Sequence, residues 1–536
     1  MLGVVVYNEV NIVRKKITRS TVRIALLYPS LYSVMSSSLS IHIMYYMLNE
    51  NYKEVYVERF HVKNLYGEEP PPRSLETNSP LKDFEIILVS MHYEPDIARL
   101  VKLLYYGKID PRRTMRDEIV VAGGPPFIAN PKPYSDIVDI AVVGEIEATL
   151  PEIIEYWMSY RGDKKRFLEE ISSLEYTYVP EYDDSDKVIR KRWINDLDQA
   201  YYPIRQFRSL DKDIVFEPAF IVETSRGCRF WCRFCMEGRI FNPYRPRSFK
   251  KLKELVEKGL VVNNLSKVII YSFIYPGSVD EKLFLEYLVD NNISVSLPSL
   301  RLNYIDDELL ELIKNTGQKT LTLAPESFSP HIHLLFGKYP ATLDLTTYIY
   351  RVLDYGFNIK LYMIYGVKGE TIEDINRSIE VLKEIGRYAR KLGVRVSISV
   401  NPLVPKPWTM FQWIGMSDLE KLRKTYKVYK EELRGLIETR PLDINWAWVQ
   451  AVISLADKDI GKILIEWGIE GGDLGSWRRV LRRTNYNVNY VFKGYSSREE
   501  LPWKNIILDP ITDKLVEKER ELALSLYGKK YNSDLY

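Results

Sequence analysis

Three cysteines lie within eight residues of one another, and they are the only cysteines in the chain. They are Cys228, Cys232 and Cys235, and they follow directly after residues 219–223, a short apolar run typical of a buried strand. Clustered thiolates of this kind hold iron–sulfur clusters, and three of them can ligate three irons of a 4Fe–4S cluster. The fourth iron would then take a ligand other than a protein thiolate, which leaves one position open for chemistry.

Other uses of three cysteines fit less well. A disulfide framework needs an even count and an oxidising compartment, whereas this count is odd and the first residues lack a signal-peptide pattern. A structural zinc site usually takes four ligands as two separated pairs. A site of three cysteines and one histidine would need a histidine brought in by the fold, since all five lie far from the triplet: His42, His61, His92, His331 and His333. The pattern favours an iron–sulfur cluster, with zinc or inert buried thiols as the alternatives.

Composition places the chain among ordinary soluble proteins. Its 536 residues are enough for two to four domains, with 46% hydrophobic and 27% charged residues. A formal net charge of +3 argues against an extended nucleic-acid-binding surface. No apolar run has the length of a membrane span. We therefore expect a cytoplasmic protein, where free thiols and an oxygen-sensitive cluster persist.

The first third of the chain alternates between expected strands and helices. Strands are expected at residues 22–28, 85–91, 118–122 and 137–143, and helices at 39–48, 97–106 and 148–160. This alternation predicts a parallel, doubly wound sheet of Rossmann-like type.

The alternation resumes at the strand that precedes the cysteines. Further strands are expected at residues 267–273, 293–297, 319–323, 358–364 and 394–400, with helices between them such as 306–315, 345–355 and 372–391. Six strand–helix units are fewer than the eight of a closed TIM barrel, so we predict an open, partial barrel. The cysteines then follow the carboxyl end of its first strand, where barrel enzymes keep their chemistry.

These patterns divide the chain into four parts. We expect an α/β domain at residues 1–165, an irregular charged linker at 166–215, the barrel at 216–415 and a mostly helical region at 416–536. The last part should begin with a helix over residues 417–438, capped by Ser417 with Glu420 three residues later.

The cysteine spacing, with Phe234 before the last cysteine, resembles the cluster loop of the radical S-adenosylmethionine (SAM) enzymes. Other segments are similar to one branch of that superfamily, which has an N-terminal domain like the cobalamin-binding domain and whose members are often labelled methylthiotransferases. The matching segments include Tyr28-Pro29-Ser30, Ala122-Gly123-Gly124-Pro125, Gly144-Glu145, Leu297-Pro298-Ser299-Leu300-Arg301, Ala324-Pro325-Glu326-Ser327 and Gly366-Val367-Lys368-Gly369.

The resemblance implies a reaction and a set of cofactors. The three cysteines would ligate the cluster, and the open iron would be chelated by the amine and carboxylate of SAM. One electron, from a donor such as ferredoxin or flavodoxin, would then cleave SAM to a 5′-deoxyadenosyl radical. No catalytic side chain is predicted beyond the cluster itself.

The resemblance also assigns contacts to SAM. Phe234 would pack on the adenine side, and the loop with Gly366 and Gly369 would lie near the adenine. Arg301 and Glu326 would contact the ribose and methionine, unless they form an ion pair across the barrel mouth. The SAM amine would bind at the end of the second barrel strand, at Tyr271 and Ser272, although the usual Gly-Gly-Glu sequence is missing there.

Other residues allow two interpretations. Gly123 and Gly124 after a strand permit close approach of a ligand, or serve only a tight turn. Glu145 and Glu147 could bind a ligand, but we expect them to cap the helix that follows. A solvated basic face is expected for the arginines around the cysteines: Arg226, Arg229, Arg233, Arg239, Arg245 and Arg247.

Missing residues narrow the function. Methylthiotransferases need three further cysteines for a second cluster, and this chain has none. The Asp-x-His-x-x-Gly signature, in which histidine ligates cobalt, is also missing, and His42 is expected to be an ordinary helix residue. We therefore predict a radical SAM enzyme with one 4Fe–4S cluster and an unknown substrate. A cobalamin-dependent methyltransferase and a non-catalytic protein with a structural metal cluster are the alternatives.

Overall fold

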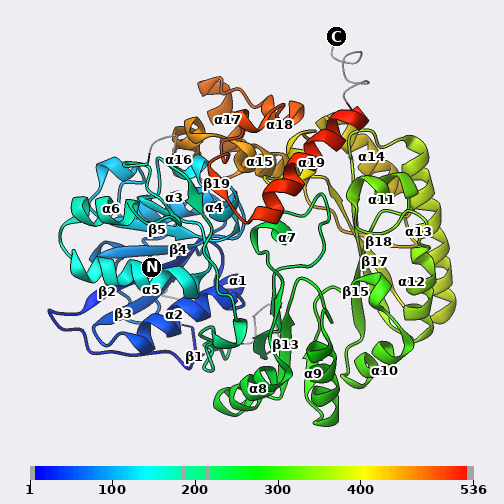
Figure 1. Cartoon of the computed structure of the whole chain (residues 1–536), viewed down its shortest axis with the longest axis horizontal. Helices are drawn as coiled ribbons and strands as arrows, with labels where there is room; N and C mark the ends of the chain where they lie inside the picture. The colour runs from blue at the N-terminus through cyan, green and yellow to red at the C-terminus, as the bar shows by residue number, and fades with distance from the viewer. Residues whose placement is uncertain (1–6, 184–186, 212–217, 528–536) are drawn as a thin grey trace.

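The computed structural model describes residues 7–183, 187–211 and 218–527. Two α/β units lie side by side, and helices from the C-terminal part of the chain run across the top of both (Figure 1). No helix in these described ranges is long and apolar enough to cross a membrane.

The N-terminal unit is built on a six-stranded sheet with the order β3-β2-β4-β5-β6-β7, parallel except for β7 at its edge. The strands are β2 (Val22–Tyr28), β3 (Val55–His61), β4 (Ile86–Ser90), β5 (Ile119–Gly123), β6 (Ile140–Val142) and β7 (Thr177–Tyr178). Helices α2 (Leu39–Asn51), α5 (Ile146–Ser159) and α6 (Lys164–Ser172) cover one face, and α3 (Asp96–Tyr106) covers the other. The prediction of a doubly wound parallel sheet is confirmed.

One strand of this sheet, β3, was not expected from the sequence. Its centre carries Glu58 and Arg59, which interrupt the apolar pattern although both side chains are fully buried. Arg59 pairs with Glu76 at 2.6 Å, and Glu58 pairs with Arg23 at 2.5 Å. Buried charges are tolerated when they are paired. The partners, Glu76 and Arg23, lie outside β3 and far from it in the sequence, so the sequence pattern does not reveal these pairs.

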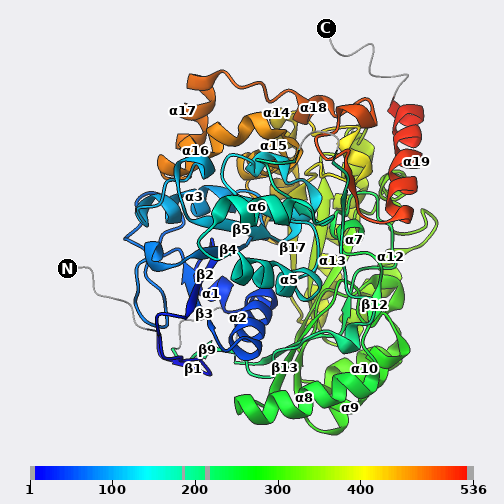
Figure 2. The same cartoon turned by 60° about the vertical axis from the view of Figure 1, so that its left-hand side comes forward.

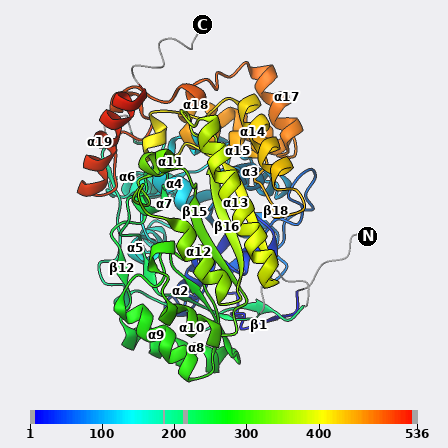
Figure 3. The same cartoon turned by 90° about the vertical axis from the view of Figure 1, so that its right-hand side faces the viewer.

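The second unit is an open barrel of parallel strands. Its strands are β10 (Phe220–Glu223), β13 (Lys267–Tyr271), β14 (Ser294–Ser296), β15 (Thr320–Glu326), β16 (Asn358–Tyr365) and β17 (Val396–Pro402). A bridge between Leu300 and Leu323 links β10-β13-β14 to β15-β16-β17. The outer helices are α8 (Phe249–Asn263), α9 (Val279–Asp290), α10 (Asp307–Asn315), α12 (Leu345–Asp354) and α13 (Ile372–Leu392) (Figure 3). All six predicted strands form, and the partial barrel is confirmed.

The helix expected at residues 417–438 is shorter than predicted. Helix α14 (Leu419–Glu432) is capped by Asp418, whose side chain accepts hydrogen bonds from the backbone of the first turn, while Ser417 is buried. The chain then turns at Gly435, with φ +72°, and forms β18 (Glu438–Thr439), which pairs with β17. The prediction of the cap and of the helix end was wrong, because glycine in the left-handed region ends the helix and lets the chain return to the sheet.

The C-terminal helices hold the two units in one arrangement. They are α15 (Ile444–Leu455), α16 (Gly461–Ile469), α17 (Leu474–Thr484), α18 (Tyr490–Lys493) and α19 (Pro510–Tyr527). Helix α16 lies alongside α3 (Figure 2), and Asn130 of the first unit donates hydrogen bonds to the carbonyls of Ser454 and Ala456. One continuous hydrophobic core passes from the α3 face of the first sheet through these helices into the barrel.

The segment expected as a linker, residues 166–215, carries structure of its own. Besides β7 it contains β8 (Ile189–Arg190), which pairs in parallel with β19 (Ile506–Ile507) near the C-terminal end of the chain. The domain boundaries given above stay a prediction.

Candidate functional site

A cavity of about 1030 Å³ lies between the N-terminal sheet and the barrel. The carboxyl ends of β4, β5 and β6 form one wall, and residues of β13 and β14 form the other. Open parallel sheets bind ligands at this edge. Four predicted site residues line the cavity: Gly123, Gly124, Tyr271 and Ser272.

Glycine is present at positions 123 and 124 for different structural reasons. Gly124 has a φ of +116°, and a Cβ there would clash with the carbonyl of Met91, so the turn itself requires glycine. A Cβ on Gly123 would contact only the Cβ of Val142, at 3.9 Å. The turn does not require glycine at position 123, where glycine leaves space in the cavity wall.

A histidine in this wall was not singled out from the sequence. His92 lies two residues beyond the end of β4, and its Nε2 lies 3.1 Å from Ser40 Oγ and 3.3 Å from Ser90 Oγ. His92 lines the cavity, and loss of solvent around the ring lowers the pKa of His92 to about 4. The imidazole is therefore neutral near pH 7. Its place just after a strand of the parallel sheet was the signal that could have identified it.

The barrel wall of the cavity is tied to the N-terminal unit. Tyr271 donates a hydrogen bond from its hydroxyl to the carbonyl of Ser37 at 2.6 Å. Ser272 Oγ lies 2.8 Å from Ser225 Oγ and donates to the carbonyl of Ile274.

The three cysteines form a loop beyond the carboxyl end of β10. None is in a disulfide; Cys232 is buried, and Cys228 and Cys235 are half-buried. In the short helix α7 (Glu237–Ile240), a Cβ built on Gly238 would lie 3.8 Å from Cys235 Sγ and 3.9 Å from Cys228 Cβ. The same Cβ would lie only 3.3 Å from the carbonyl oxygen of Phe230, so glycine at position 238 lets the cysteine loop pack closely against α7.

The surroundings of the thiols bear on which metal would fit. Across the described ranges, no group of three or more His, Cys, Asp or Glu side chains is placed to hold a single metal ion. A 4Fe–4S cluster takes each thiolate on a different iron, so its ligands need not converge on one point. Burial raises the pKa of the Cys228 and Cys235 thiols, and iron binding would favour their thiolate forms. The donor set fits a cluster.

Four of the six arginines around the cysteines do not face solvent. The side chains of Arg226, Arg239, Arg245 and Arg247 are buried, whereas Arg229 is exposed and Arg233 is half-buried. The expectation was wrong because their partners come from distant parts of the chain, which the sequence pattern does not show.

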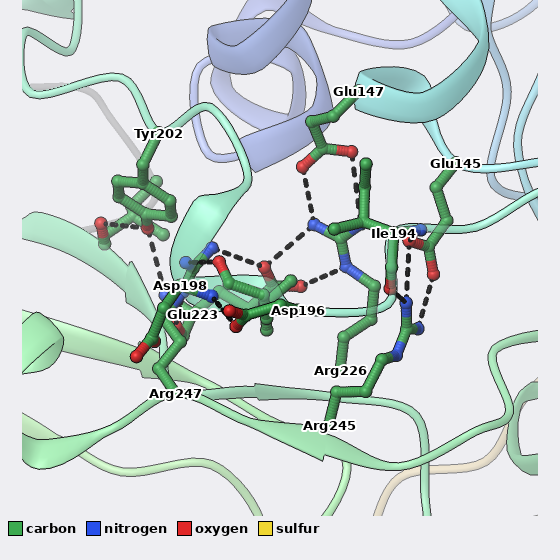
Figure 4. A network of polar contacts seen from close by, with 12 residues as sticks. Glu145, Glu147, Ile194, Asp196, Asp198, Tyr202, Glu223, Arg226, Arg245 and Arg247 are labelled. Atoms are coloured by element: carbon green, nitrogen blue, oxygen red, sulfur yellow. Dashed lines mark hydrogen bonds and ion pairs between the residues drawn. The ribbon is translucent and has the colours of Figure 1, made fainter.

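Arg226 is the centre of this network (Figure 4). It donates two hydrogen bonds to Glu147, at 2.8 and 3.1 Å, and two to Glu223, both at 2.9 Å. It also lies 3.0 Å from Glu145, which in turn accepts from Arg245. Glu145 occupies the N-cap position of α5 but makes no side-chain capping bond, so the capping interpretation of this carboxylate was wrong. The network joins the N-terminal sheet to the residue two positions before Cys228.

The C-terminal helix also reaches the cysteine region. Arg239, in α7, donates to Glu519 of α19 at 2.6 Å, and both side chains are buried. Burial raises the pKa of Glu519, and Arg239 opposes that shift.

At the barrel mouth, Arg301 and Glu326 do not form the ion pair considered above. Glu326 pairs with Lys338 at 2.6 Å, while Arg301 donates to the carbonyl of Lys338. The guanidinium of Arg301 lies over the ring of Phe230, 3.6 Å from its centroid, within the cysteine loop. Lys338 was missed because it belongs to no recognised motif. Only the fold, which places it across the barrel mouth from the cysteines, identifies it.

The remaining predicted contacts lie in packed surroundings. Phe234 makes an edge contact with Phe336, with centroids 4.8 Å apart. Gly366 packs directly against α14, and a Cβ on Gly369 would lie 3.1 Å from the ring of Tyr527 in α19. Local packing therefore accounts for both glycines, and their role toward SAM stays a prediction.

Comparison with protein-family models identifies the class. Residues 40–180 match the model described as radical SAM proteins, N-terminal, and residues 222–382 match that of the radical SAM superfamily. The chain belongs to the radical SAM superfamily and is an enzyme of that class. The second match begins in β10 and includes all three cysteines.

Two proteins of Methanocaldococcus jannaschii are similar in sequence. An uncharacterised protein is 29% identical over 90% of this chain and 98% of its own length. A candidate methylthiotransferase is 25% identical over 33% of this chain and 38% of its own length.

Two solved structures are also similar. The radical SAM methyltransferase TsrM of Kitasatospora setae, with cobalamin and a 4Fe–4S cluster bound, is 11% identical with a TM-score of 0.46, over 71% of this chain and 72% of its own. The cobalamin-dependent radical enzyme OxsB, with aqua-cobalamin and SAM bound, is 13% identical with a TM-score of 0.48, over 96% and 81%.

Proposed function

We propose that this enzyme holds a single 4Fe–4S cluster on Cys228, Cys232 and Cys235 and uses it to cleave SAM reductively. The observation that carries the proposal is the set of three free thiols in the loop beyond the carboxyl end of β10. When bound, the cluster supplies the electron that converts SAM to a 5′-deoxyadenosyl radical. A ferredoxin or flavodoxin would supply that electron to the protein.

Charged residues at the barrel mouth would orient SAM. Arg301 brings positive charge over the ring of Phe230 in the cysteine loop, which suits the SAM carboxylate. Glu326 is buried beside Lys338 and can accept hydrogen bonds from the SAM amine or ribose hydroxyls.

Other predicted contacts would complete the SAM site. Tyr271 and Ser272 end β13 and supply hydroxyls on the cavity side. Phe234 and the backbone of Gly366 and Gly369 would flank the adenine.

The test is anaerobic reconstitution followed by reduction with dithionite in the presence of SAM. Iron, sulfide and 5′-deoxyadenosine are measured for the wild type, for Cys235→Ala and for Ser159→Ala, a control at the exposed end of α5. We expect four irons and nucleoside product for the wild type and the control, and loss of both for Cys235→Ala. Tightly bound zinc without iron or sulfide would overturn the proposal and favour a structural metal site.

The cavity supports a second candidate function. Ligand pockets for small molecules commonly measure about 300–1,000 Å³, and this cavity of about 1030 Å³ is slightly larger than that range. We propose that a corrinoid binds there, in the cavity whose wall includes Gly123 and His92. A bound corrinoid would supply a methyl group for transfer, which would make the protein a cobalamin-dependent methyltransferase.

Corrinoid binding is tested by visible absorption after anaerobic incubation with hydroxocobalamin and gel filtration. Gly123→Leu would project into the cavity from a position where a Cβ meets no backbone atom, and we expect it to reduce bound cobalamin at least tenfold. Ser159→Leu, outside the cavity, is the control and should bind like wild type. Wild-type protein that retains no cobalamin would contradict this candidate without affecting the SAM reaction.

A further inference from the structure

The inner face of the barrel carries polar side chains in register across three strands. Thr322 of β15, Lys360 of β16 and Ser397 of β17 stand opposite one another, and Tyr362 stands opposite Ser399 one step further along. We call these five residues the polar face. All five are half-exposed, whereas the residues that alternate with them are buried.

The direction of the polar face follows from the packing. The alternating residues, such as Leu361 and Ile398, belong to the hydrophobic core beneath α12 and α13. These helices lie on one side of the strands and the N-terminal unit lies on the other (Figure 3). Because successive side chains of a strand point to opposite sides, the polar face looks into the barrel toward the N-terminal unit.

This interior differs from that of a packed barrel. Closed barrels fill their centre with layers of bulky branched side chains. Here the layers contain Ser397, Ser399 and Thr322, which are too small to fill it, and the strands remain accessible. An accessible interior lined by hydroxyls is suited to bind a hydrophilic molecule rather than to stabilise the fold.

The polar face has unused hydrogen-bonding capacity. Within the described ranges, the side chains of Thr322, Tyr362, Ser397 and Ser399 make no hydrogen bond to other residues. The Lys360 ammonium contacts only the ring of Tyr362 there, 5.0 Å from its centroid. Strands β16 and β17 contain no carboxylate at all, so nothing on them neutralises Lys360.

We propose that the polar face binds the substrate, and that the substrate is a hydrophilic molecule with an anionic group, a phosphate or carboxylate, held by Lys360. The proposal rests on the proposed function, because that function puts the reacting carbon at the carboxyl ends of the strands. Lys360 lies five residues before the end of β16 at Tyr365, which is about 16 Å at roughly 3.3 Å per residue. The substrate is thus elongated, with its anionic end about 16 Å from the carbon that reacts. An amine would find no carboxylate on β16 or β17 here.

The anion site can be tested without cluster or SAM. Pyridoxal 5′-phosphate carries an anionic group and condenses with lysine amines, and borohydride then fixes it for mass spectrometry. We expect Lys360 to be labelled at a concentration at least fivefold lower than Lys250, an exposed lysine of α8, and inorganic pyrophosphate to protect Lys360 alone. Equal labelling of the two lysines, or no protection by pyrophosphate, would overturn the anion site whatever the enzyme does with SAM.

The substrate class is tested by activity. A metabolite extract of the source cells is separated into an anion-exchange-retained fraction, a flow-through fraction and an organic-solvent fraction. Each is added to reconstituted enzyme with SAM, and 5′-deoxyadenosine is measured above the level without extract. We expect only the retained fraction to stimulate the wild type, and the Lys250→Met control to respond equally.

Variants at Lys360 complete this test. Lys360→Met should lose at least tenfold of the stimulation, and Lys360→Arg should restore most of it, since the charge is what the anion needs. Stimulation by the organic-solvent fraction or the flow-through, SAM cleavage that no fraction stimulates, or a Lys360→Met variant that responds like wild type would each overturn the inference. Absence of SAM cleavage under all conditions, with pyrophosphate protection intact, would instead refute the proposed function.

Discussion

The ion network around Arg226 gives the sharpest prediction about how the cysteine loop is held. Arg226 makes four hydrogen bonds to two carboxylates and lies 3.0 Å from a third, all with little exposure to solvent. Replacing it by methionine keeps much of the side-chain volume but leaves Glu145, Glu147 and Glu223 with only two arginines, Arg245 and Arg247. An uncompensated carboxylate would remain in a buried place.

The magnitude follows from the environment. Removing one partner of a buried ion pair costs about 3–5 kcal/mol, and the lower end applies here because the cavity beside Glu147 admits water. For a unit of 150–250 residues, each kcal/mol lowers the midpoint of thermal unfolding by roughly 2–4 °C. We therefore expect Arg226→Met to lower the first unfolding transition of the cluster-free protein by about 6–12 °C.

A second variant separates the network from simple damage to the fold. Glu147→Gln removes one charge but keeps the shape, and the loss of one charged partner should cost about 1.5–3 kcal/mol. The double variant, Arg226→Met with Glu147→Gln, has no excess negative charge. Its loss of stability should therefore be smaller, by about 1–3 kcal/mol, than the sum of the losses of the two single variants.

The assay combines calorimetry of the cluster-free protein with iron content after reconstitution. Arg226→Met should also retain less iron than the wild type, because the strand that leads into Cys228 is no longer fixed to the N-terminal unit. Losses of stability that simply add in the double variant would refute the reasoning. An Arg226→Met protein with an unchanged unfolding transition and full iron content would also refute it.

The sequence was sufficient for the architecture. Strand and helix alternation predicted the doubly wound sheet and all six barrel strands, because buried parallel strands are short apolar runs bounded by turns. It failed at β3, where Glu58 and Arg59 are buried in pairs. It also failed at the end of α14, where Gly435 turns the chain back into the sheet.

The candidate site was predicted only in part, for a physical reason. The cysteines are adjacent in sequence, so their spacing alone indicates a metal centre. The contacts of Arg226, Lys338 and His92 depend on segments that only the fold brings together, some of them 79 residues apart. A charged residue looks the same in sequence whether it faces water or a buried partner, so burial of the arginines was not predictable.

Three further predictions concern single residues. Replacing any one of the cysteines by alanine, for example Cys228→Ala, should abolish both cluster binding and formation of 5′-deoxyadenosine, because each thiolate binds a different iron. The measurements are iron content and nucleoside yield. Arg301→Ala and Glu326→Ala should keep iron at the wild-type level but lower the rate of SAM cleavage or the affinity for SAM at least tenfold; loss of iron instead would contradict their assignment to SAM. Burial alone would raise the pKa of Glu145, but Arg226 and Arg245 outweigh it and lower that pKa below the ordinary value of 4.5. A carboxyl whose pKa is lower in the folded state adds stability above its unfolded pKa and loses that contribution as the pH falls through the folded value. Stability of the cluster-free protein should therefore decrease below about pH 4.5. Glu145→Gln should be less stable than wild type at pH 7, and this difference in stability should shrink toward pH 3. An equal difference at pH 7 and pH 3 would show that the carboxylate charge is not what stabilises the network.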